Sequence, residues 1–208
     1  MTVIGFIGAA HIGTHAARAV TAAGCDVVLS STRDAGSLAP LVAELGDHAS
    51  AATVGDAAAA ADAVVAANPD PRPQLGAGRA LAQKTVIVTS NYNRDRQGAV
   101  AALDSGETTV PGLLQAHLPG AHVVGAFSRI SSAEVTTAGR PAGTPRRRAL
   151  AIARGDPGPR TPSPRSATLS AVSGPIWATA VSPRSSPTRT SPSSRSTPAR
   201  AVRSHSGR

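Results

Sequence analysis

The fold of this chain is decided by its first stretch, Val3-Ile4-Gly5-Phe6-Ile7-Gly8-Ala9-Ala10-His11-Ile12-Gly13. The apolar run at residues 3–7 is typical of a strand that is buried on both faces. A glycine-containing turn, Gly8-x-Ala10-x-x-Gly13, follows directly, and an alanine-rich helical pattern then runs from Thr14 to Ala23 and ends at Gly24. The stretch therefore predicts a strand, a tight turn and a helix in succession.

Strand and helix patterns go on alternating after this first unit. Apolar runs predict further strands at 26–30, 50–53, 63–67, 85–89 and 122–126, and helical patterns lie between them at 38–45, 56–61 and 110–118. Such alternation favours right-handed βαβ crossovers and a parallel sheet. We expect residues 1–145 to form one α/β domain, a Rossmann-like doubly wound and mainly parallel sheet with helices on both faces. Ligands of such sheets bind beyond the carboxyl ends of the strands.

The charge of the chain divides it at the same place. The formal net charge is +9, but residues 1–145 carry nine basic and eleven acidic side chains, a net charge of −2. Residues 146–208 carry twelve arginines and one acid, a net charge of +11. The basic character therefore belongs to the C-terminal segment and says nothing about the fold.

The sequence carries few features that indicate a cellular compartment or disulfide bonds. Cys25 is the only cysteine, so it cannot form a disulfide within the chain. The sequence begins without a basic region followed by an apolar core, and no apolar run approaches the roughly 18 residues that span a bilayer. We expect a cytoplasmic protein with no membrane partner. A homodimer is left open.

The glycine turn has the position of a dinucleotide-binding fingerprint, between a strand and the helix that follows it. Gly8 permits the tight turn and Gly13 lets the helix approach the strand. The N–H groups at the helix start would face phosphates. Ala10 stands at the middle position, which usually lacks a side chain. A tight turn without a ligand is the alternative. The candidate cofactor-binding residues of this turn are Gly8, Ala9, Ala10, His11, Ile12 and Gly13.

The end of the second strand indicates which dinucleotide the turn would bind. An NAD site usually carries a carboxylate there, about 20 residues beyond the glycines. This chain has Ser30-Ser31-Thr32-Arg33 at the end of the strand, and the first acidic residue after them is Asp34. Hydroxyl groups and a guanidinium suit a 2′-phosphate. The four residues therefore favour NADP(H), the alternative being that Arg33 is a solvated surface side chain.

Several segments resemble the coenzyme F-420-dependent NADP oxidoreductase family in order and spacing: Gly5–Gly8, His11–Gly13, Asp26–Arg33, Leu41–Gly46, Val86–Tyr92, Leu118–Val124 and Arg140–Pro145. The resemblance covers nearly all of residues 1–153. It implies hydride transfer between NADPH and a small-molecule acceptor, which is coenzyme F-420 in the founding members. It also implies that Asn68 and Pro69 form the turn over the nicotinamide side. Ser90 and Asn91 follow a strand end and are added to the cofactor-binding candidates, and Tyr92 either contacts the nicotinamide half or packs in the protein.

The chain departs from the pattern of that family at three places that bear on activity. Ala10 replaces the middle glycine, and the stretch Asp70-Pro71-Arg72-Pro73 after the turn at Asn68 and Pro69 is unusually stiff. At the third place, near the expected sixth strand, Gly125 and Ser128 stand where relatives commonly have lysine and asparagine. Losing both polar side chains puts turnover in more doubt than cofactor binding, so a cofactor-binding protein without activity is the alternative to an NADP-dependent reductase. Hydride transfer needs no side-chain nucleophile, so no catalytic residue is assigned. The scattered histidines have no metal-ligand spacing, and no metal site is predicted.

The segment 146–208 contains 13 serines, 12 arginines and 9 prolines. It cannot bury enough apolar surface to offset its ordering entropy, so we expect a disordered tail rather than a second domain. Three origins are considered. A frameshift near Arg154 would explain the loss of the family pattern there. A genuine basic tail would bind nucleic acid nonspecifically, and an inert tail is the third.

The frameshift explanation predicts the content of the gene. Translating the codons after position 153 in the other two frames is expected to yield a continuation with helical and strand patterns that completes the acceptor side. DNA sequencing of the locus checks this. Two alternative frames without such a pattern would contradict the frameshift.

Overall fold

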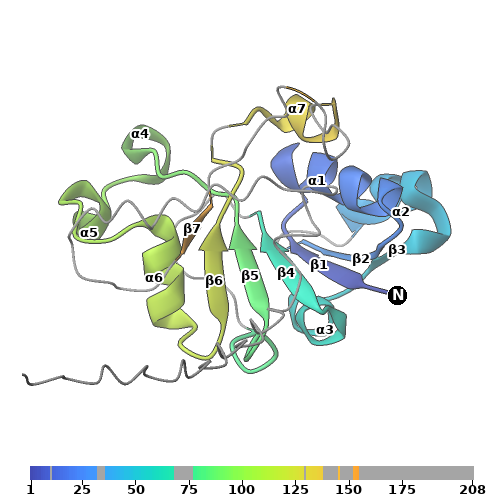
Figure 1. The fold of residues 1–208 in the computed structure, drawn as a ribbon, viewed down its shortest axis with the longest axis horizontal. Helices are drawn as coiled ribbons and strands as arrows, with labels where there is room; N and C mark the ends of the chain where they lie inside the picture. The colour runs from blue at the N-terminus through green and yellow to red at the C-terminus, as the bar shows by residue number, and fades with distance from the viewer. Residues whose placement is uncertain are drawn as a thin grey trace, which may run out of the picture.

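One seven-stranded sheet forms the centre of the protein (Figure 1). The structure is a computed structural model that describes residues 1–9, 11–31, 36–67, 77–128, 130–137, 145 and 152–154. The strand order is β3-β2-β1-β4-β5-β6-β7. The first six strands are parallel to their neighbours, and β7 runs antiparallel to β6. The strands are β1 (Val3–Ile7), β2 (Asp26–Ser30), β3 (Ala49–Ala51), β4 (Ala63–Ala66), β5 (Thr85–Val88), β6 (His122–Gly125) and β7 (Ala153–Arg154).

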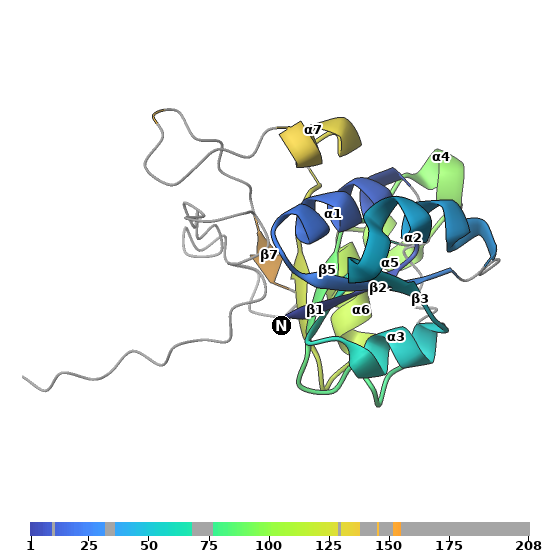
Figure 2. The same cartoon turned by 90° about the vertical axis from the view of Figure 1, so that its right-hand side faces the viewer.

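Helices cover both faces of this sheet, as the edge-on view shows (Figure 2). Helices α1, α2 and α7 pack on one face, and α3 and α6 pack on the other. The expected doubly wound α/β fold is thereby confirmed. The helices are α1 (His11–Ala22), α2 (Ala39–Leu45), α3 (Val54–Ala60), α4 (Arg94–Gln97), α5 (Ala101–Asp104), α6 (Val110–His117) and α7 (Ser132–Thr137), with 3-10 turns η1 (Gly36–Leu38) and η2 (Gly46–His48).

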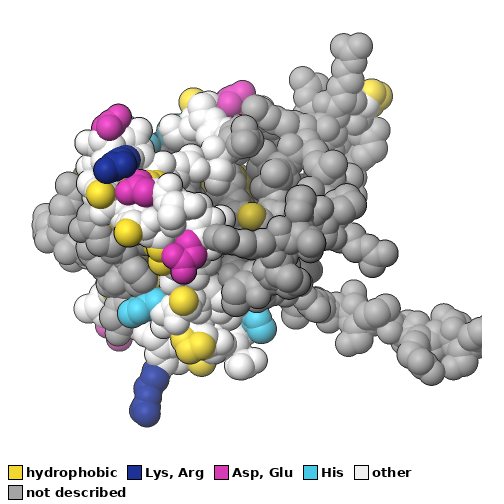
Figure 3. Space-filling model, turned by 90° about the vertical axis from the view of Figure 1, so that its left-hand side faces the viewer, with side chains coloured by type: hydrophobic (Ala, Val, Ile, Leu, Met, Phe, Trp, Pro, Cys, Tyr) yellow, Lys and Arg dark blue, Asp and Glu magenta, His cyan; other side chains and the backbone are white. Residues whose placement is uncertain are grey.

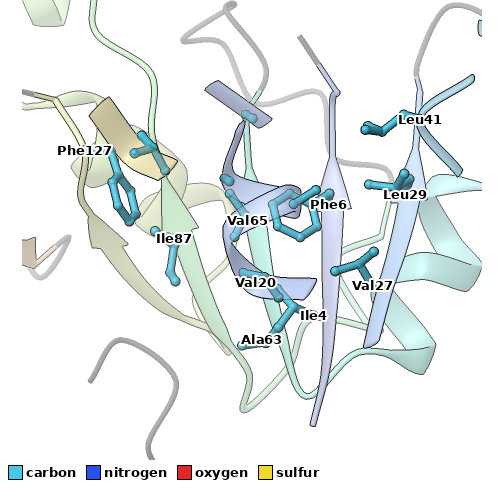
Figure 4. Packing of buried hydrophobic residues seen from close by; sticks show 14 of the residues in the cluster. Ile4, Phe6, Val20, Val27, Leu29, Leu41, Ala63, Val65, Ile87 and Phe127 are labelled. Carbon is cyan, nitrogen blue, oxygen red and sulfur yellow. The ribbon is translucent and has the colours of Figure 1, made fainter. Parts of the chain in front are cut away.

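The two helical layers produce two hydrophobic cores, because successive side chains of a strand point to opposite faces. The core under α1 contains Ile4 and Phe6 of β1, Val65 of β4 and Ile87 of β5, all at most 1 % exposed (Figure 4). The opposite core is formed mainly by the alternate strand residues together with α3 and α6. Burial on both faces explains why the central strands are continuous apolar runs.

A glycine inside β1 allows α3 to lie close to the sheet. A Cβ atom on Gly5 would stand 2.9 Å from the carbonyl oxygen of Ala57 and 2.9 Å from the Cβ of Ala61. Real Cβ atoms do not approach other atoms that closely. The absence of a side chain at this glycine therefore lets the end of α3 pack directly against the backbone of β1. The glycine costs strand propensity but permits the tight layer packing.

The helix boundaries differ from the sequence-based expectations in ways that local hydrogen bonds explain. Helix α1 begins at His11 rather than Thr14, so it starts inside the glycine turn. Thr53, expected in the third strand, instead caps α3 by accepting a hydrogen bond from the N–H of Asp56 at 3.2 Å. Helix α7 was not expected, although Ser131 and Glu134 make one half of a capping box: the N–H of Ser131 donates to Glu134 Oε2, and the hydroxyl of Ser131 donates to the same oxygen.

The surface of the described residues carries charges of both signs. Figure 3 shows acidic and basic side chains interspersed over one face of the molecule. The expected disordered tail lies outside the described residues, except for residues 152–154, where Ala153 and Arg154 form β7. Of the helices in the described part, none has the length and apolar character needed to cross a membrane.

Candidate functional site

The candidate site lies at the carboxyl edge of the sheet, where the strand order reverses. Strand β1 pairs with β2 on one side and with β4 on the other. Helix α1 leads from β1 to β2 on one face, whereas α3 leads to β4 on the other. In open parallel sheets, ligands bind beyond the carboxyl ends at such a reversal. The predicted residues Gly8, Ser31, Ser90 and Asn91 all follow strands at this edge.

The turn between β1 and α1 has a conformation that only glycine adopts readily. Gly8 has a φ of 93°, and its N–H donates to the carbonyl oxygen of Ser30 at 3.0 Å. The hydroxyl of Thr14 in α1 donates to the carbonyl oxygen of Ala9 at 2.8 Å, which ties the turn to the helix. Ala10 lies outside the described residues. The turn is therefore held from both the β2 side and the helix side.

Gly13 brings the first turn of α1 against the sheet. A Cβ atom there would overlap with the carbonyl oxygen of Gly8 and would stand 3.1 Å from the Cβ of Ala67, the residue after β4. The first N–H groups of a helix have no acceptor within the helix, and the helix dipole makes this end electropositive. Close packing at Gly13 therefore places an anion-binding helix start between the ends of β1 and β4.

The other side chains of this turn divide between solvent and core. His11 is exposed. Ala9 and Ile12 are partly buried and pack against the core under α1. Their backbones could contact a ligand, but these two side chains already serve packing.

Ser30, predicted to help bind the 2′-phosphate, uses its side chain inside the protein. It is fully buried, and its hydroxyl donates to the carbonyl oxygen of Phe6 at 2.8 Å. Together with the bond from Gly8, this fastens the end of β2 to β1. Ser31 is the half-buried residue that follows. Thr32 and Arg33 lie outside the described residues.

The loops after β5 and β6 are joined at the same edge. Asn91 is exposed, and its side-chain amide donates to the carbonyl oxygen of Ser128 at 3.1 Å. Ser90, beside it, is half-buried. Asn68 and Pro69 lie outside the described residues. The hydrogen bond from Asn91 therefore joins the loop after β5 to the loop after β6. Both strands lie on the side of β1 away from β2.

Gly125 occupies a position with no room for a longer side chain. A Cβ atom there would stand 2.6 Å from Cγ of Pro111 in α6 and 3.7 Å from the carbonyl oxygen of Ala153 in β7. A lysine, as relatives carry, would need α6 to move away from the sheet. The glycine is thus matched to the packing of α6 in this chain.

Tyr92 packs in the protein, which is one of the two roles expected for it. Its ring packs against the core under α6. Its hydroxyl oxygen lies 2.7 Å from Oδ1 of Asp104 and 3.1 Å from the carbonyl oxygen of Gly98, and it accepts from the N–H of Val100 at 3.0 Å. Loss of hydration and the hydrogen bond to Asp104 raise the pKa of Tyr92 above its ordinary value.

Two residues at this edge were not identified from the sequence. Thr89 follows β5 and is 6 % exposed. Side chains two residues apart in a strand point to the same face of the sheet, and Ile87 lies on the α1 face. The sequence could therefore have placed Thr89 on that face. Phe127, 4 % exposed, has a left-handed φ of 65°. An aromatic residue rarely adopts that conformation, and nothing in the sequence signals it.

The comparison with protein families concerns the part of the chain that contains this edge. Residues 3–92 match a family described as NADP oxidoreductase, coenzyme F420-dependent. The resemblance seen in the sequence is thereby confirmed for this stretch, which includes the glycine turn and the ends of β2, β4 and β5. No curated protein matches the sequence.

Solved structures share the fold. A candidate F420-dependent NADP reductase from Arthrobacter sp. FB24 is 19 % identical, with 74 % of each chain covered and a TM-score of 0.59. An uncharacterised protein from Sinorhizobium meliloti is 23 % identical, again with 74 % of each chain covered and a TM-score of 0.56. A reductive aminase from Aspergillus terreus, solved with NADPH and ethyl-5-oxohexanoate, is 18 % identical over 77 % of this chain and 50 % of that one, with a TM-score of 0.50. The chain thus spans about half the length of the aminase. The family match over residues 3–92 is thus to NADP oxidoreductases, and the likeness to these solved structures shows a shared fold.

Gly13→Ala tests the close packing at the turn. The added methyl group would overlap with the backbone of Gly8, so we expect a loss of about 2–3 kcal/mol in the free energy of unfolding, measured by urea denaturation. Gly55→Ala in α3 is the matched control, because the nearest atom to its Cβ is Thr53 Oγ1 at 3.9 Å. It should not destabilise the chain. Equal effects of the two substitutions would contradict the packing described for Gly13.

The raised pKa of Tyr92 can be measured directly, because it is the only tyrosine. The neutral phenol is favoured in the folded chain, so its contribution to stability is complete below pH about 10 and is lost as the pH rises through the folded pKa. Phenolate absorbance should therefore appear at higher pH in the native chain than in the chain denatured in urea. Coincident titration curves would contradict both the loss of hydration of Tyr92 and its hydrogen bond to Asp104.

Proposed function

We propose that this protein binds NADP(H) at the carboxyl edge between β1 and β4 and transfers a hydride between NADPH and a small-molecule acceptor, with coenzyme F-420 as the first candidate. The observation that carries the proposal is the start of α1, held at the strand-order reversal by the contact between Gly13 and Gly8. Residues 3–92, which match the F420-dependent oxidoreductase family, contain this whole arrangement.

The residues present fit a dinucleotide. Gly8 and Gly13 add no side chain to the turn, and the start of α1 offers N–H groups to the pyrophosphate. Arg33 would hold the 2′-phosphate in a charge-assisted contact, and Ser31 would lie beside it. NADPH itself supplies the hydride, so the task of the chain is to hold the nicotinamide against the acceptor and to exclude water.

A cofactor-binding protein without turnover is the second candidate. The packing of Gly125 favours it, because Pro111 and β7 leave no space for a polar side chain at a position where relatives commonly carry lysine. Ser128 contributes its carbonyl group to a hydrogen bond with Asn91 rather than an asparagine side chain to an acceptor. Both features reduce the polar groups available on the acceptor side.

The two candidates are separated by measuring binding and turnover on the same preparation of the full chain. NADPH binding is followed by titration of its fluorescence, and NADPH oxidation is followed by absorbance with a deazaflavin acceptor in the absence of oxygen. The reductase proposal predicts both NADPH binding and NADPH oxidation. Binding without oxidation would support the second candidate, and no binding would contradict both.

Arg33→Ala tests the choice of NADP over NAD. A charge-assisted contact with the 2′-phosphate contributes about 1.5–3 kcal/mol, which corresponds to about a 10- to 100-fold preference for NADP. Isothermal titration should show this preference in the original chain and its loss in Arg33→Ala. The control Arg18→Ala removes an arginine that pairs with Glu44 between α1 and α2, and it should leave the preference unchanged. Equal affinities for NAD and NADP in the original chain would refute the assignment.

A further inference from the structure

One buried polar group at the candidate site has no hydrogen-bond partner. Within the described part of the chain, three buried side-chain atoms lack a partner: His15 Nδ1, Thr21 Oγ1 and Thr89 Oγ1. Only Thr89 lies at the carboxyl edge of the sheet. The residue is 6 % exposed, so its side chain is shielded from bulk solvent.

The strand register places Thr89 beside the glycine turn. Ile7, Ala66 and Val88 stand in one row across β1, β4 and β5. The hydrogen-bond ladder continues one residue further, because the N–H of Ala67 donates to Ile7 and the N–H of Thr89 donates to Ala66. The next row therefore consists of Gly8, Ala67 and Thr89, and it crosses the point where the strand order reverses.

The side chain of Thr89 belongs to the face on which α1 begins. Ile87, two residues earlier, packs in the core under α1 (Figure 4). Because side chains alternate, Thr89 lies on that same face. The Cβ of Ala67, its neighbour in the row, lies within 3.1 Å of a Cβ built on Gly13 in the first turn of α1. The hydroxyl is thus on the side of the sheet where the proposed dinucleotide would lie.

Within the part of the chain that the structure describes, nothing in the packing calls for a hydroxyl at this position. A buried hydroxyl without a partner destabilises a protein, whereas valine has nearly the same shape and carries no polar group. Valine also suits the end of a buried strand. A group that lowers stability and sits at a ligand-binding edge is best explained by a partner that comes with the ligand.

We propose that Thr89 Oγ1 binds the nicotinamide riboside half of the dinucleotide, through its carboxamide or a ribose hydroxyl. The inference rests on the proposed NADP(H) site. Strand β5 lies two strand spacings from β1, about 10 Å, on the side away from β2. A dinucleotide whose pyrophosphate is at the start of α1 and whose adenosine half is over β2 has its other half over β4 and β5. Among the described residues of that region, Thr89 is the one with a buried polar atom that lacks a partner.

The test compares Thr89→Val with Thr89→Ser and with Thr85→Val in the full-length chain. Thr85 begins the same strand on the same face but at the opposite edge, so it is a matched control. The probes are NADP⁺ and 2′,5′-ADP, which lacks the nicotinamide half. Thr89→Val should raise the Kd for NADP⁺ about tenfold and leave the Kd for 2′,5′-ADP within twofold. Thr89→Ser, which keeps a hydroxyl, should retain most of the affinity, and Thr85→Val should change neither Kd.

The melting temperature of the unliganded chain supplies a second readout. Thr89→Val removes an unpaired buried hydroxyl, so it should raise Tm by a few degrees while it weakens NADP⁺ binding. A purely structural role would instead lower Tm and weaken both probes together, which would overturn the inference. Unchanged NADP⁺ affinity in Thr89→Val would also overturn it.

Two further outcomes separate this inference from the proposed function. If the original chain binds neither probe, both the proposed NADP(H) site and the proposed role of Thr89 are wrong. If it binds both probes and Thr89→Val behaves like the original chain, only the role of Thr89 falls. The acetylpyridine analogue of NADP⁺, which lacks the carboxamide nitrogen but keeps the carbonyl oxygen, tests the nitrogen as the partner. Thr89→Val should weaken NADP⁺ more than this analogue if the carboxamide nitrogen is the partner, and equally if the carboxamide oxygen or a ribose hydroxyl is.

Discussion

The close contact of Gly13 with the backbone of Gly8 and with Ala67 is the constraint on which the rest of the site depends. It sets the start of α1 directly against the ends of β1 and β4. Ser30 secures the same turn from the other side, because its carbonyl group accepts the N–H of Gly8 and its hydroxyl holds the carbonyl of Phe6. These contacts join the start of α1 and the end of β2 to β1. Substitution at any of these contacts is expected to affect stability and ligand geometry together.

Most of the sheet was predictable from the sequence, because its central strands are buried on both faces and are bounded by residues that break strands. The runs at β1, β2, β4, β5 and β6 are continuous apolar segments, and each was placed to within one residue. The glycine turn was also predictable, since its spacing reflects local backbone geometry. Alternation of strands and helices was enough to predict the doubly wound arrangement. Helix α7 was missed although Ser131 and Glu134 carried a capping signal.

The details of the candidate site depended on contacts between distant residues and could not be predicted. Ser30 has the right position for a 2′-phosphate, but its pairing with β1 directs the hydroxyl to Phe6. In the sequence, Gly125 indicates the loss of a polar side chain. In the structure, the absence of a side chain at Gly125 allows Pro111 of α6 to pack against β6. Thr89 has the sequence pattern of an ordinary strand residue, and only its burial in the folded chain reveals an unpaired hydroxyl. Each of these facts depends on which elements meet in space.

Hydrogen–deuterium exchange of the full chain with and without NADP⁺ tests the central claim most directly, because it locates the ligand on the sheet. Backbone amides exchange more slowly where a ligand covers them or stabilises their hydrogen bonds. The account predicts slower exchange at residues 8–14, in the turn and first helical turn, and at residues 88–91 after β5. Slower exchange confined to other segments, with no change at residues 8–14, would contradict it.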